Sequence, residues 1–244
     1  TSLPFYDAMH LLDHDIEHVL TRDERSAGYM ADGYSRVTGR PGICEGPSGG
    51  GATYILPGLI ESSESSIATL AITSDISVST YGRYPLTEVD QEALMRPLTK
   101  WNTVIRKAEH IPRMVRAAFR AMTTGRPGAA HLGLPYDIQY DPVDSSDIWA
   151  DRGLATYPAY RTGPEAEAVE AAVDAILSAR KPLIVCGGGI VVSGAMDELD
   201  RLAGRLDIAV ATSISGQGSL ADTHDCALGV VGSNGGTDET WEMM

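Results

Sequence analysis

The stretch TRDERSAGYMADGYSRVTGRPG, residues 21–42, is the most informative part of the 244-residue chain. Residues 24–38 are predicted to form a helix that Gly39 and Pro41 end. A short strand is expected just before it, over residues 15–21 (DIEHVLT). Glu24 would then lie at a strand-to-helix junction, where α/β sheets place ligand-binding groups. The same residue could instead favour the positive end of a helix, and the pattern alone leaves both interpretations open.

Strand and helix patterns alternate along the first part of the chain. Residues 43–46 (ICEG) predict a strand, and a glycine turn opens a second helix within residues 48–63. Residues 67–76 form an apolar run typical of a buried strand. Apolar residues at helical spacing predict a helix over residues 111–122, and residues 127–135 predict another strand. Such alternation predicts an α/β fold with a parallel sheet that helices cover on both faces.

A polar segment divides the chain into two predicted domains. Residues 141–164 are rich in Asp, Ser, Pro and Gly, which is typical of a linker. We therefore expect one domain over residues 1–140 and a second over residues 165–244. In the second, a helix over 165–179 with Val169, Val173 and Ile176 on one face precedes a single βαβ unit. One such unit would bury little core, so this Rossmann-like α/β domain is expected to be partial.

Composition excludes several classes of function. The chain has 33 acidic and 19 basic residues, a net charge of −14, which repels phosphate backbones and argues against a nucleic-acid partner. No apolar run approaches the roughly 18 residues of a membrane span, and the residues from Thr1 on, with no basic start and no apolar run, lead us to expect no signal peptide. The three cysteines share no short spacing, as expected of buried free thiols. We therefore expect a cytoplasmic protein without a membrane partner.

Several motifs together resemble one enzyme family. Glu24 with AGYMADGYSRVTGRPG (27–42), SGGGATYILPGL (48–59), LAITSDI (70–76), EVDQEALMRPLTKWN (88–102) and GRPGAAHLGLP (125–135) resemble the pyrimidine-binding (PYR) domain of thiamine diphosphate (ThDP) enzymes. KPLIVCGGG (181–189) resembles the opening of the family's central domain. The resemblance covers nearly the whole chain and is to enzymes of the acetolactate synthase type.

The resemblance gives Glu24 a chemical task. In the family, a glutamate at this position exchanges a proton with N1′ of the cofactor's aminopyrimidine, so that N4′ can remove the C2 proton of the thiazolium. The cofactor then reacts with a carbonyl compound, commonly a 2-keto acid, and serves as an electron sink. Glu24 is thus the expected catalytic residue. Asp23 stands where relatives often carry His, so substrate proton transfer need not follow the family's pattern.

The resemblance also assigns cofactor and substrate contacts. Pro47, Gly49, Gly50 and Tyr54 align with positions near the pyrimidine side of ThDP. Gly50 replaces a proline and Tyr54 an asparagine of the family, and the glycines could simply form a flexible turn before a helix. Thr87 replaces a glutamine near the reacting carbons, and one hydroxyl cannot reproduce an amide's hydrogen bonds. Thr87 is therefore the expected substrate contact, for a small carbonyl compound other than, or as well as, pyruvate.

Further parts of the enzyme are implied but not found in the sequence. ThDP binds Mg²⁺ through its diphosphate, and the family's diphosphate-binding (PP) domain, with its Gly-Asp-Gly…Asn motif, is expected on another subunit or lost by truncation or disorder. The family's first strand is expected upstream of Thr1. We predict no metal ligands within this chain, and a homo-oligomer.

The glycine-rich turn GGGIVVSG (187–194) leaves a second hypothesis for the function of the chain open. Val192 breaks the G-x-G-x-x-G spacing there, so we do not expect FAD or ADP, although related central domains bind them. The alternative function is a non-catalytic nucleotide-binding or regulatory protein that kept the α/β scaffold.

Overall fold

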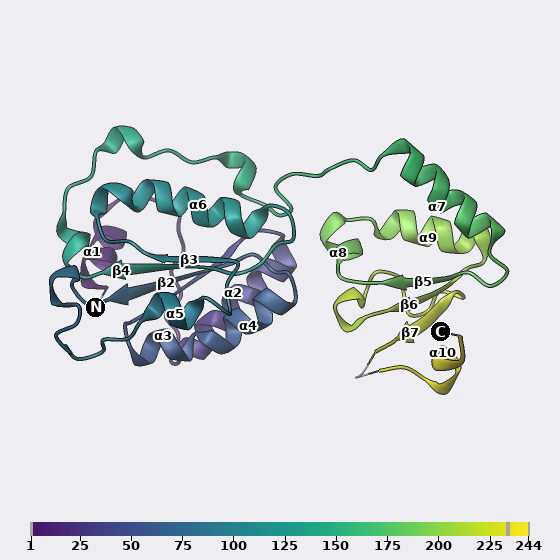
Figure 1. The fold of residues 1–244 in the computed structure, drawn as a ribbon, viewed down its shortest axis with the longest axis horizontal. Coiled ribbons are helices and arrows are strands. Elements are labelled where there is room, and N and C mark those ends of the chain that lie inside the picture. Colours follow the sequence, from purple (N-terminus) through teal and green to yellow (C-terminus); the bar gives the residue numbers. More distant parts are fainter. Residues whose placement is uncertain (1, 233–234, 244) are drawn as a thin grey trace. The chain divides into compact units, whose positions relative to one another are not determined.

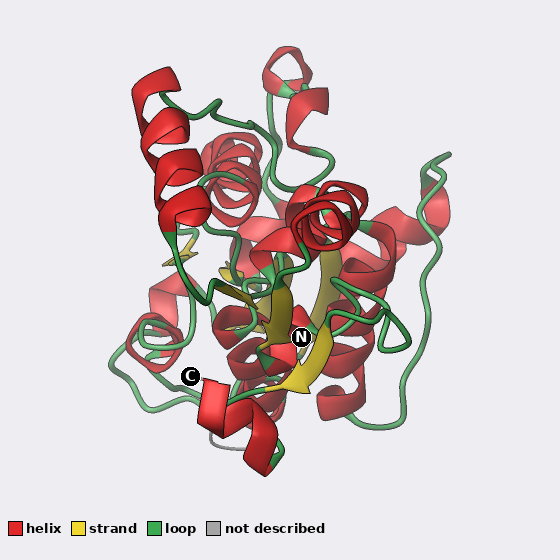
Figure 2. Cartoon of the chain, turned by 90° about the vertical axis from the view of Figure 1, so that its right-hand side faces the viewer, coloured by secondary structure: helices red, strands yellow, loops and turns green. Residues whose placement is uncertain are grey.

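The computed structural model describes residues 2–232 and 235–243. The chain forms two compact units, Thr1–Tyr160 and Arg161–Met244. Figure 2 shows by colour that the strands are short and that helices and loops make up most of the chain. Among the described residues, no helix combines the length and the apolar character needed to cross a membrane.

The first unit is built on a parallel sheet of four strands in the order β1-β2-β4-β3. The strands are β1 (Gly42–Gly46), β2 (Thr69–Asp75), β3 (Trp101–Val104) and β4 (Ala130–Pro135). Gly42 lies opposite Thr69, and Leu70 lies opposite Ala130. The central strand β2 is almost entirely buried, which explains its continuous run TLAITSD. The predicted parallel α/β sheet is confirmed.

Helices cover both faces of this sheet (Figure 1). On one face lie α2 (Glu24–Thr38), α3 (Gly50–Tyr54), α4 (Leu56–Glu64) and α5 (Gln91–Met95), and on the other lies α6 (Ile111–Thr123). The predicted helix over 24–38 is confirmed. The Asp23 side chain accepts a hydrogen bond from the Arg25 N–H at its start, and Gly39 ends it with a φ of 66°.

Among the α-helices and strands of the first unit, α1 (Leu3–Leu11), β3 and α5 were not predicted, and one predicted strand is absent. The prediction of a strand over residues 15–21 is wrong, because this segment contains neither helix nor strand. Its apolar residues Ile16, Val19 and Leu20 are exposed. A strand obtains its hydrogen bonds from a neighbouring strand, and β1 pairs only with β2 among the described residues.

The segment predicted as a linker is partly built into the first unit. Residues 141–160 contain the short 3₁₀ helices η4 (Ser145–Asp147) and η5 (Arg152–Leu154), and Leu154 and Tyr157 are buried. The Tyr157 hydroxyl donates a hydrogen bond of 2.9 Å to the Ser35 carbonyl oxygen. Residues 161–164, by contrast, are exposed.

The second unit contains a parallel sheet in the order β5-β6-β7. Its described helices and strands are α7 (Ala166–Ser178), β5 (Leu183–Cys186), α8 (Gly189–Ser193), α9 (Met196–Leu206), β6 (Ala209–Thr212), η6 (Ile214–Gly216), β7 (Ala227–Val230) and α10 (Asp238–Met243). The first unit also contains the 3₁₀ helices η1 (Val78–Thr80), η2 (Ala108–His110) and η3 (Asp137–Tyr140). Leu199 and Ala203 of α9 pack on Cys186 and Val210 of the sheet. The predicted α/β character is confirmed, with β7 as a strand beyond the predicted βαβ unit. The expected apolar face of α7 is not buried within the unit, since Val169 and Val173 are exposed.

Candidate functional site

Glu24 lies at the first turn of α2, beside the turn that joins β1 to α3. A Cβ atom on Gly51 would lie 2.4 Å from Cγ and Cδ of Pro47 and 3.3 Å from Oε1 of Glu24. Only glycine fits between these two residues. The structure therefore brings the predicted residues Glu24 and Pro47 together around the backbone of Gly51.

A second group of contacts joins Gly49 to Thr87. Gly49 has a φ of 64°, and a Cβ atom there would lie 2.7 Å from Cβ of Thr87. The hydroxyls of Ser48 and Thr87 are 2.8 Å apart, and the Ser48 N–H donates a hydrogen bond of 3.0 Å to Oγ of Ser74. The predicted cofactor residue Gly49 and the predicted substrate residue Thr87 thus lie in contact at the carboxyl edge of the sheet.

Gly50 and Tyr54, two of the positions that depart from the family's pattern, lie on open surface. A Cβ atom on Gly50, the first residue of α3, would have no neighbour within 4 Å among the described residues. Tyr54, the last residue of α3, is 56% exposed. A side chain or a bound ring therefore has room beside Gly50, and Tyr54 contributes an exposed aromatic side chain at the end of α3.

An ion pair stands next to Glu24. Nη2 of Arg25 lies 2.6 Å from Oδ2 of Asp23, and hydrogen bonds from Arg25 lower the pKa of the Asp23 carboxyl to about 2. Asp23 is therefore ionised at neutral pH and holds no proton to donate. The Arg25 charge is largely matched by Asp23, which leaves Glu24 as the carboxylate of this corner that faces Gly51.

Two segments of the chain match models of one enzyme family. Residues 1–94 match the family described as thiamine pyrophosphate enzyme, N-terminal TPP binding domain, and residues 169–244 match the thiamine pyrophosphate enzyme central domain. Thiamine pyrophosphate is another name for ThDP. The chain carries the N-terminal and central domains of the thiamine pyrophosphate enzymes. The family resemblance and the α/β fold class predicted from the sequence are both confirmed.

The chain is similar to proteins named acetolactate synthase. A probable acetolactate synthase large subunit of Methanocaldococcus jannaschii is 39% identical over 235 residues, which cover 96% of this chain and 39% of the relative. A probable acetolactate synthase large subunit of Methanococcus aeolicus is 38% identical over 96% of this chain and 39% of the relative. An acetolactate synthase of Arthrospira platensis is 34% identical over 96% of this chain and 41% of the relative. The chain therefore spans about two fifths of the length of these relatives.

The residues at the β1–α3 turn fit the ring of the cofactor that this enzyme family binds. A flat aromatic ring needs a surface without side chains, which the backbone at Gly50 offers, and a ring nitrogen needs a carboxylate partner, which Glu24 offers. Among the described residues, no group of three or more His, Cys, Asp or Glu side chains is placed to hold a metal ion.

The sequence did not single out two residues of this corner, Ser48 and Ser74. Ser48 is the first residue of the SGGGAT motif, whose glycines, Gly51 included, are the ones expected near the cofactor ring. Ser74 is the next-to-last residue of β2, and nothing in the local pattern predicts that its hydroxyl accepts a hydrogen bond from the Ser48 N–H.

Proposed function

We propose that this chain is the cofactor-activating part of a ThDP-dependent carboligase or decarboxylase of the acetolactate synthase type. Its substrate would be a 2-keto acid or a related carbonyl compound. The observation that carries this proposal is the position of Glu24 beside Gly51 and Pro47, within the segment that matches the N-terminal ThDP-binding domain.

The chain's own residues would bind and polarise the aminopyrimidine. When bound, ThDP supplies a carbon nucleophile and an electron sink. Glu24 would hold a proton shared with the ring nitrogen N1′, because a carboxylate exchanges protons readily with a ring base when water is excluded. Pro47 and the backbone of Gly49 and Gly50 would hold the ring, with Tyr54 at the rim. No other carboxylate of the corner competes, since Asp23 is paired with Arg25.

Thr87 would contact the substrate. Its hydroxyl lies 2.8 Å from that of Ser48, so the pair can offer one donor and one acceptor to a carbonyl or hydroxyl group. A threonine reaches less far than a glutamine, which leaves room for a larger substituent. This supports a 2-keto acid or related compound and does not select pyruvate.

The diphosphate and its Mg²⁺ would be held elsewhere in the enzyme. The matched domains are the N-terminal and central ones, so we infer that a PP domain on the same or another subunit completes the cofactor site. The 244-residue chain alone would then be inactive.

We further propose that the protein is a homo-oligomer. Tyr29, Met30 and Tyr34 of α2 and Ile60 of α4 are each about half exposed, on two adjacent helices of the first unit. An apolar surface of this kind is typical of protein interfaces. Light scattering at micromolar concentration should give the mass of a dimer or larger assembly. A chain that stays monomeric with ThDP added would contradict this.

The role of Glu24 is tested by Glu24→Gln in the complete enzyme, this chain together with its PP domain. Glutamine keeps the size of the side chain but cannot exchange a proton, so we expect hydrogen–deuterium exchange at C2 of bound ThDP to slow by roughly 100-fold. Folding should be unchanged by circular dichroism. Glu17→Gln, which removes the same charge from the exposed segment before α2, is the matched control. An unchanged exchange rate in Glu24→Gln would rule out the proposed role.

A further inference from the structure

The carboxyl end of β2 carries a buried side-chain network that the proposed mechanism does not use. Gln91, the first residue of α5, is 1% exposed. Its Oε1 accepts a hydrogen bond from the Thr73 hydroxyl, and its Nε2 donates one of 2.9 Å to the Ser74 carbonyl oxygen. Burial raises the pKa of the Asp75 carboxyl, and hydrogen bonds that include one from Gln91 oppose this rise. Gln91 thus contacts the last three residues of β2.

The orientation of the Gln91 amide follows from its partners. The Ser74 carbonyl can only accept, so the amide nitrogen faces it and the amide oxygen faces Thr73. The Thr73 hydroxyl then donates its one proton to Gln91 and accepts from Nε2 of His131, 2.7 Å away. Thr73 and His131 are fully buried, and a buried polar network with every bond made is rigid. The network therefore holds α5 on β2 and β4 in one arrangement.

The same strand end is bonded to the turn that carries the proposed cofactor contacts. Oγ of Ser74 accepts a hydrogen bond of 3.0 Å from the Ser48 N–H. The Ser48 hydroxyl lies 2.8 Å from that of Thr87, which precedes Gln91 by four residues. These contacts close a ring through three segments, which are the β1–α3 turn, the end of β2 and the loop before α5.

Thr87 has a backbone conformation that needs support from its surroundings. Its φ of 74° is uncommon for a β-branched residue and persists where neighbouring contacts hold it. Two hydrogen bonds of its own loop are local, because the Glu88 N–H donates to the Pro85 carbonyl and the Gly82 N–H donates to Oε1 of Glu88. Such bonds shape the loop but do not attach it to the sheet.

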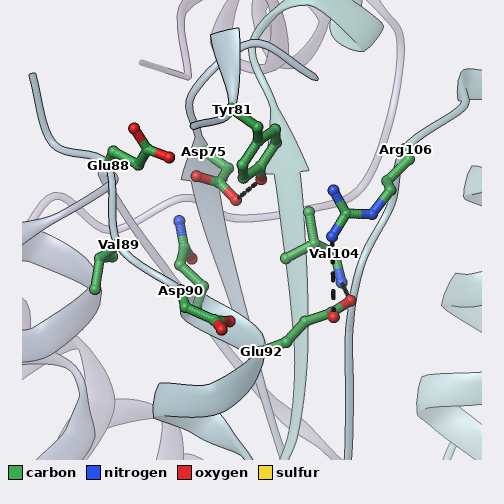
Figure 3. Close-up of a pocket in the computed structure, with 9 residues that line it drawn as sticks. Asp75, Tyr81, Glu88, Val89, Asp90, Glu92, Val104 and Arg106 are labelled. Carbon is green, nitrogen blue, oxygen red and sulfur yellow. Dashed lines mark hydrogen bonds and ion pairs between the residues drawn. The ribbon is translucent and has the colours of Figure 1, made fainter. Parts of the chain in front are cut away.

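Both ends of this loop are attached to β2. At its start the Tyr81 hydroxyl donates a hydrogen bond to the Asp75 carboxylate, which Figure 3 shows at the end of the strand. At its other end the attachment is the Gln91 amide. This second attachment reaches Ser74, the residue that also holds the Ser48 turn. Gln91 is therefore placed to set how the loop and the turn meet.

We propose that Gln91 is a positioning residue that fixes the Thr87 hydroxyl against Ser48, and thereby sets how tightly a carbonyl substrate binds. It acts through Ser74 and the start of α5, without touching the substrate. The inference rests on the proposed role of Thr87 as the substrate contact. Without the Gln91 amide, α5 loses its hydrogen bonds to β2, so the Ser48–Thr87 pair should separate more often.

Amide exchange in the 244-residue chain tests the positioning without cofactor or substrate. Gln91→Met keeps the length of the side chain and removes its hydrogen bonds, so exchange of the Ser48 N–H should become at least about tenfold faster. Gln217→Met makes the same change at an exposed position. Ala118→Gly lowers stability from a buried position on α6, on the other face of the sheet. Both controls should leave Ser48 exchange within about twofold. Unchanged exchange in Gln91→Met, or equal acceleration in Ala118→Gly, would overturn the proposal.

In the complete enzyme, the same variant separates positioning from cofactor activation. With pyruvate and 2-oxobutanoate as probes, Gln91→Met should raise KM at least about fivefold, because the substrate contact is misplaced. Hydrogen–deuterium exchange at C2 of bound ThDP involves Glu24 and no carbonyl substrate, so it should stay within about twofold. An unchanged KM, or an equal slowing of C2 exchange, would overturn the proposal. If neither keto acid reacts with the unmodified enzyme, the proposed substrate class is wrong, and Ser48 exchange alone decides the positioning.

If Gln91→Met does not fold, native-state exchange of the unmodified chain decides. The Ser48 N–H and the Nε2 protons of Gln91 should open with the same free energy and the same dependence on urea, because they belong to one cooperative unit. Opening of Ser48 while the Gln91 amide stays protected would show that the two are not coupled, and would overturn the proposal.

Discussion

At the scale of single residues, His131 shows how the fold fixes the protonation of a side chain. It lies on β4 with no solvent exposure, and its Nε2 is 2.7 Å from Oγ1 of Thr73. The Thr73 hydroxyl donates to Oε1 of Gln91, so it must accept from His131, which assigns the proton to Nε2. Burial lowers the pKa of His131 to about 3, and the imidazole is neutral in the folded protein.

This pKa predicts a pH dependence of stability. In the unfolded chain His131 has an ordinary histidine pKa of about 6.5. Below that pH the unfolded chain binds a proton at His131 that the folded state does not bind. His131 therefore costs stability as the pH falls from about 6.5 towards 3. Between pH 7 and pH 5, the free energy of unfolding should fall by about 2 kcal/mol more in the unmodified chain than in His131→Gln. Glutamine can keep the donor to Thr73 but does not titrate.

Urea unfolding of both proteins at the two pH values gives this difference directly. Carboxylates that titrate in the same range contribute equally to both proteins and cancel. Parallel pH dependence in the two proteins would mean that His131 accepts a proton in the folded state.

At the scale of elements, α2 and α4 cross with their backbones in contact. A Cβ atom on Gly58 would lie 2.5 Å from the carbonyl carbon and 2.7 Å from Cα of Gly28. Gly58→Ala should therefore force the helices apart and lower the free energy of unfolding by about 1–3 kcal/mol, although alanine is the better helix former. Gly33→Ala in α2 is the matched control, because a Cβ there meets nothing within 4 Å among the described residues.

Gly33→Ala should change the free energy of unfolding in the opposite direction. Alanine at position 33 gains helix propensity without a clash, so its free energy of unfolding should rise by about 0.5–1 kcal/mol. Chemical unfolding of the two variants beside the unmodified chain tests both. Equal effects would show that propensity, and not the crossing, decides.

The elements that could be predicted are those with local signals. α2 has a cap, Pro41 after Gly39 and a motif; β2 has an apolar run; and α6 has apolar residues at helical spacing. β3 has no such signal, because Trp101–Val104 become a strand by pairing with β4, which lies far along the chain. Conversely, residues 15–21 have the composition of a strand without a neighbour in the described fold.

The candidate site divides in the same way. Each of Glu24, Pro47 and Gly49 could be selected from its motif, and all three lie within the segment that matches the family's N-terminal domain; their roles stay predictions. The contact between Gly49 and Thr87 could not be predicted. It depends on the loop before α5, where Tyr84 and Thr87 adopt positive φ values of 56° and 74°. Such a conformation is set by tertiary contacts and not by the local sequence.

At the scale of the whole molecule, the position of the joint between the units has a measurable consequence. Residues 161–164 are exposed, and their backbone has no hydrogen bond among the described residues. Residues 151–160, which sequence composition assigns to the same linker, contribute buried Leu154 and Tyr157 to the first unit. The Ala159 N–H also donates a hydrogen bond of 2.9 Å to the Thr123 carbonyl oxygen.

A site for a specific protease inserted between Thr162 and Gly163 should therefore allow cleavage without loss of stability in the first unit. The same site between Ala150 and Asp151 should, after cleavage, free residues 151–160 from the first unit. Removing the side chains of Leu154 and Tyr157 from the core should cost about 3–5 kcal/mol. Urea unfolding of the cleaved proteins, with Trp149 and Trp241 replaced by Phe so that the fluorescence comes from Trp101 on β3, reports on the first unit in both. Equal midpoints after the two cuts would show that residues 151–160 do not stabilise it, and that the joint begins before residue 151.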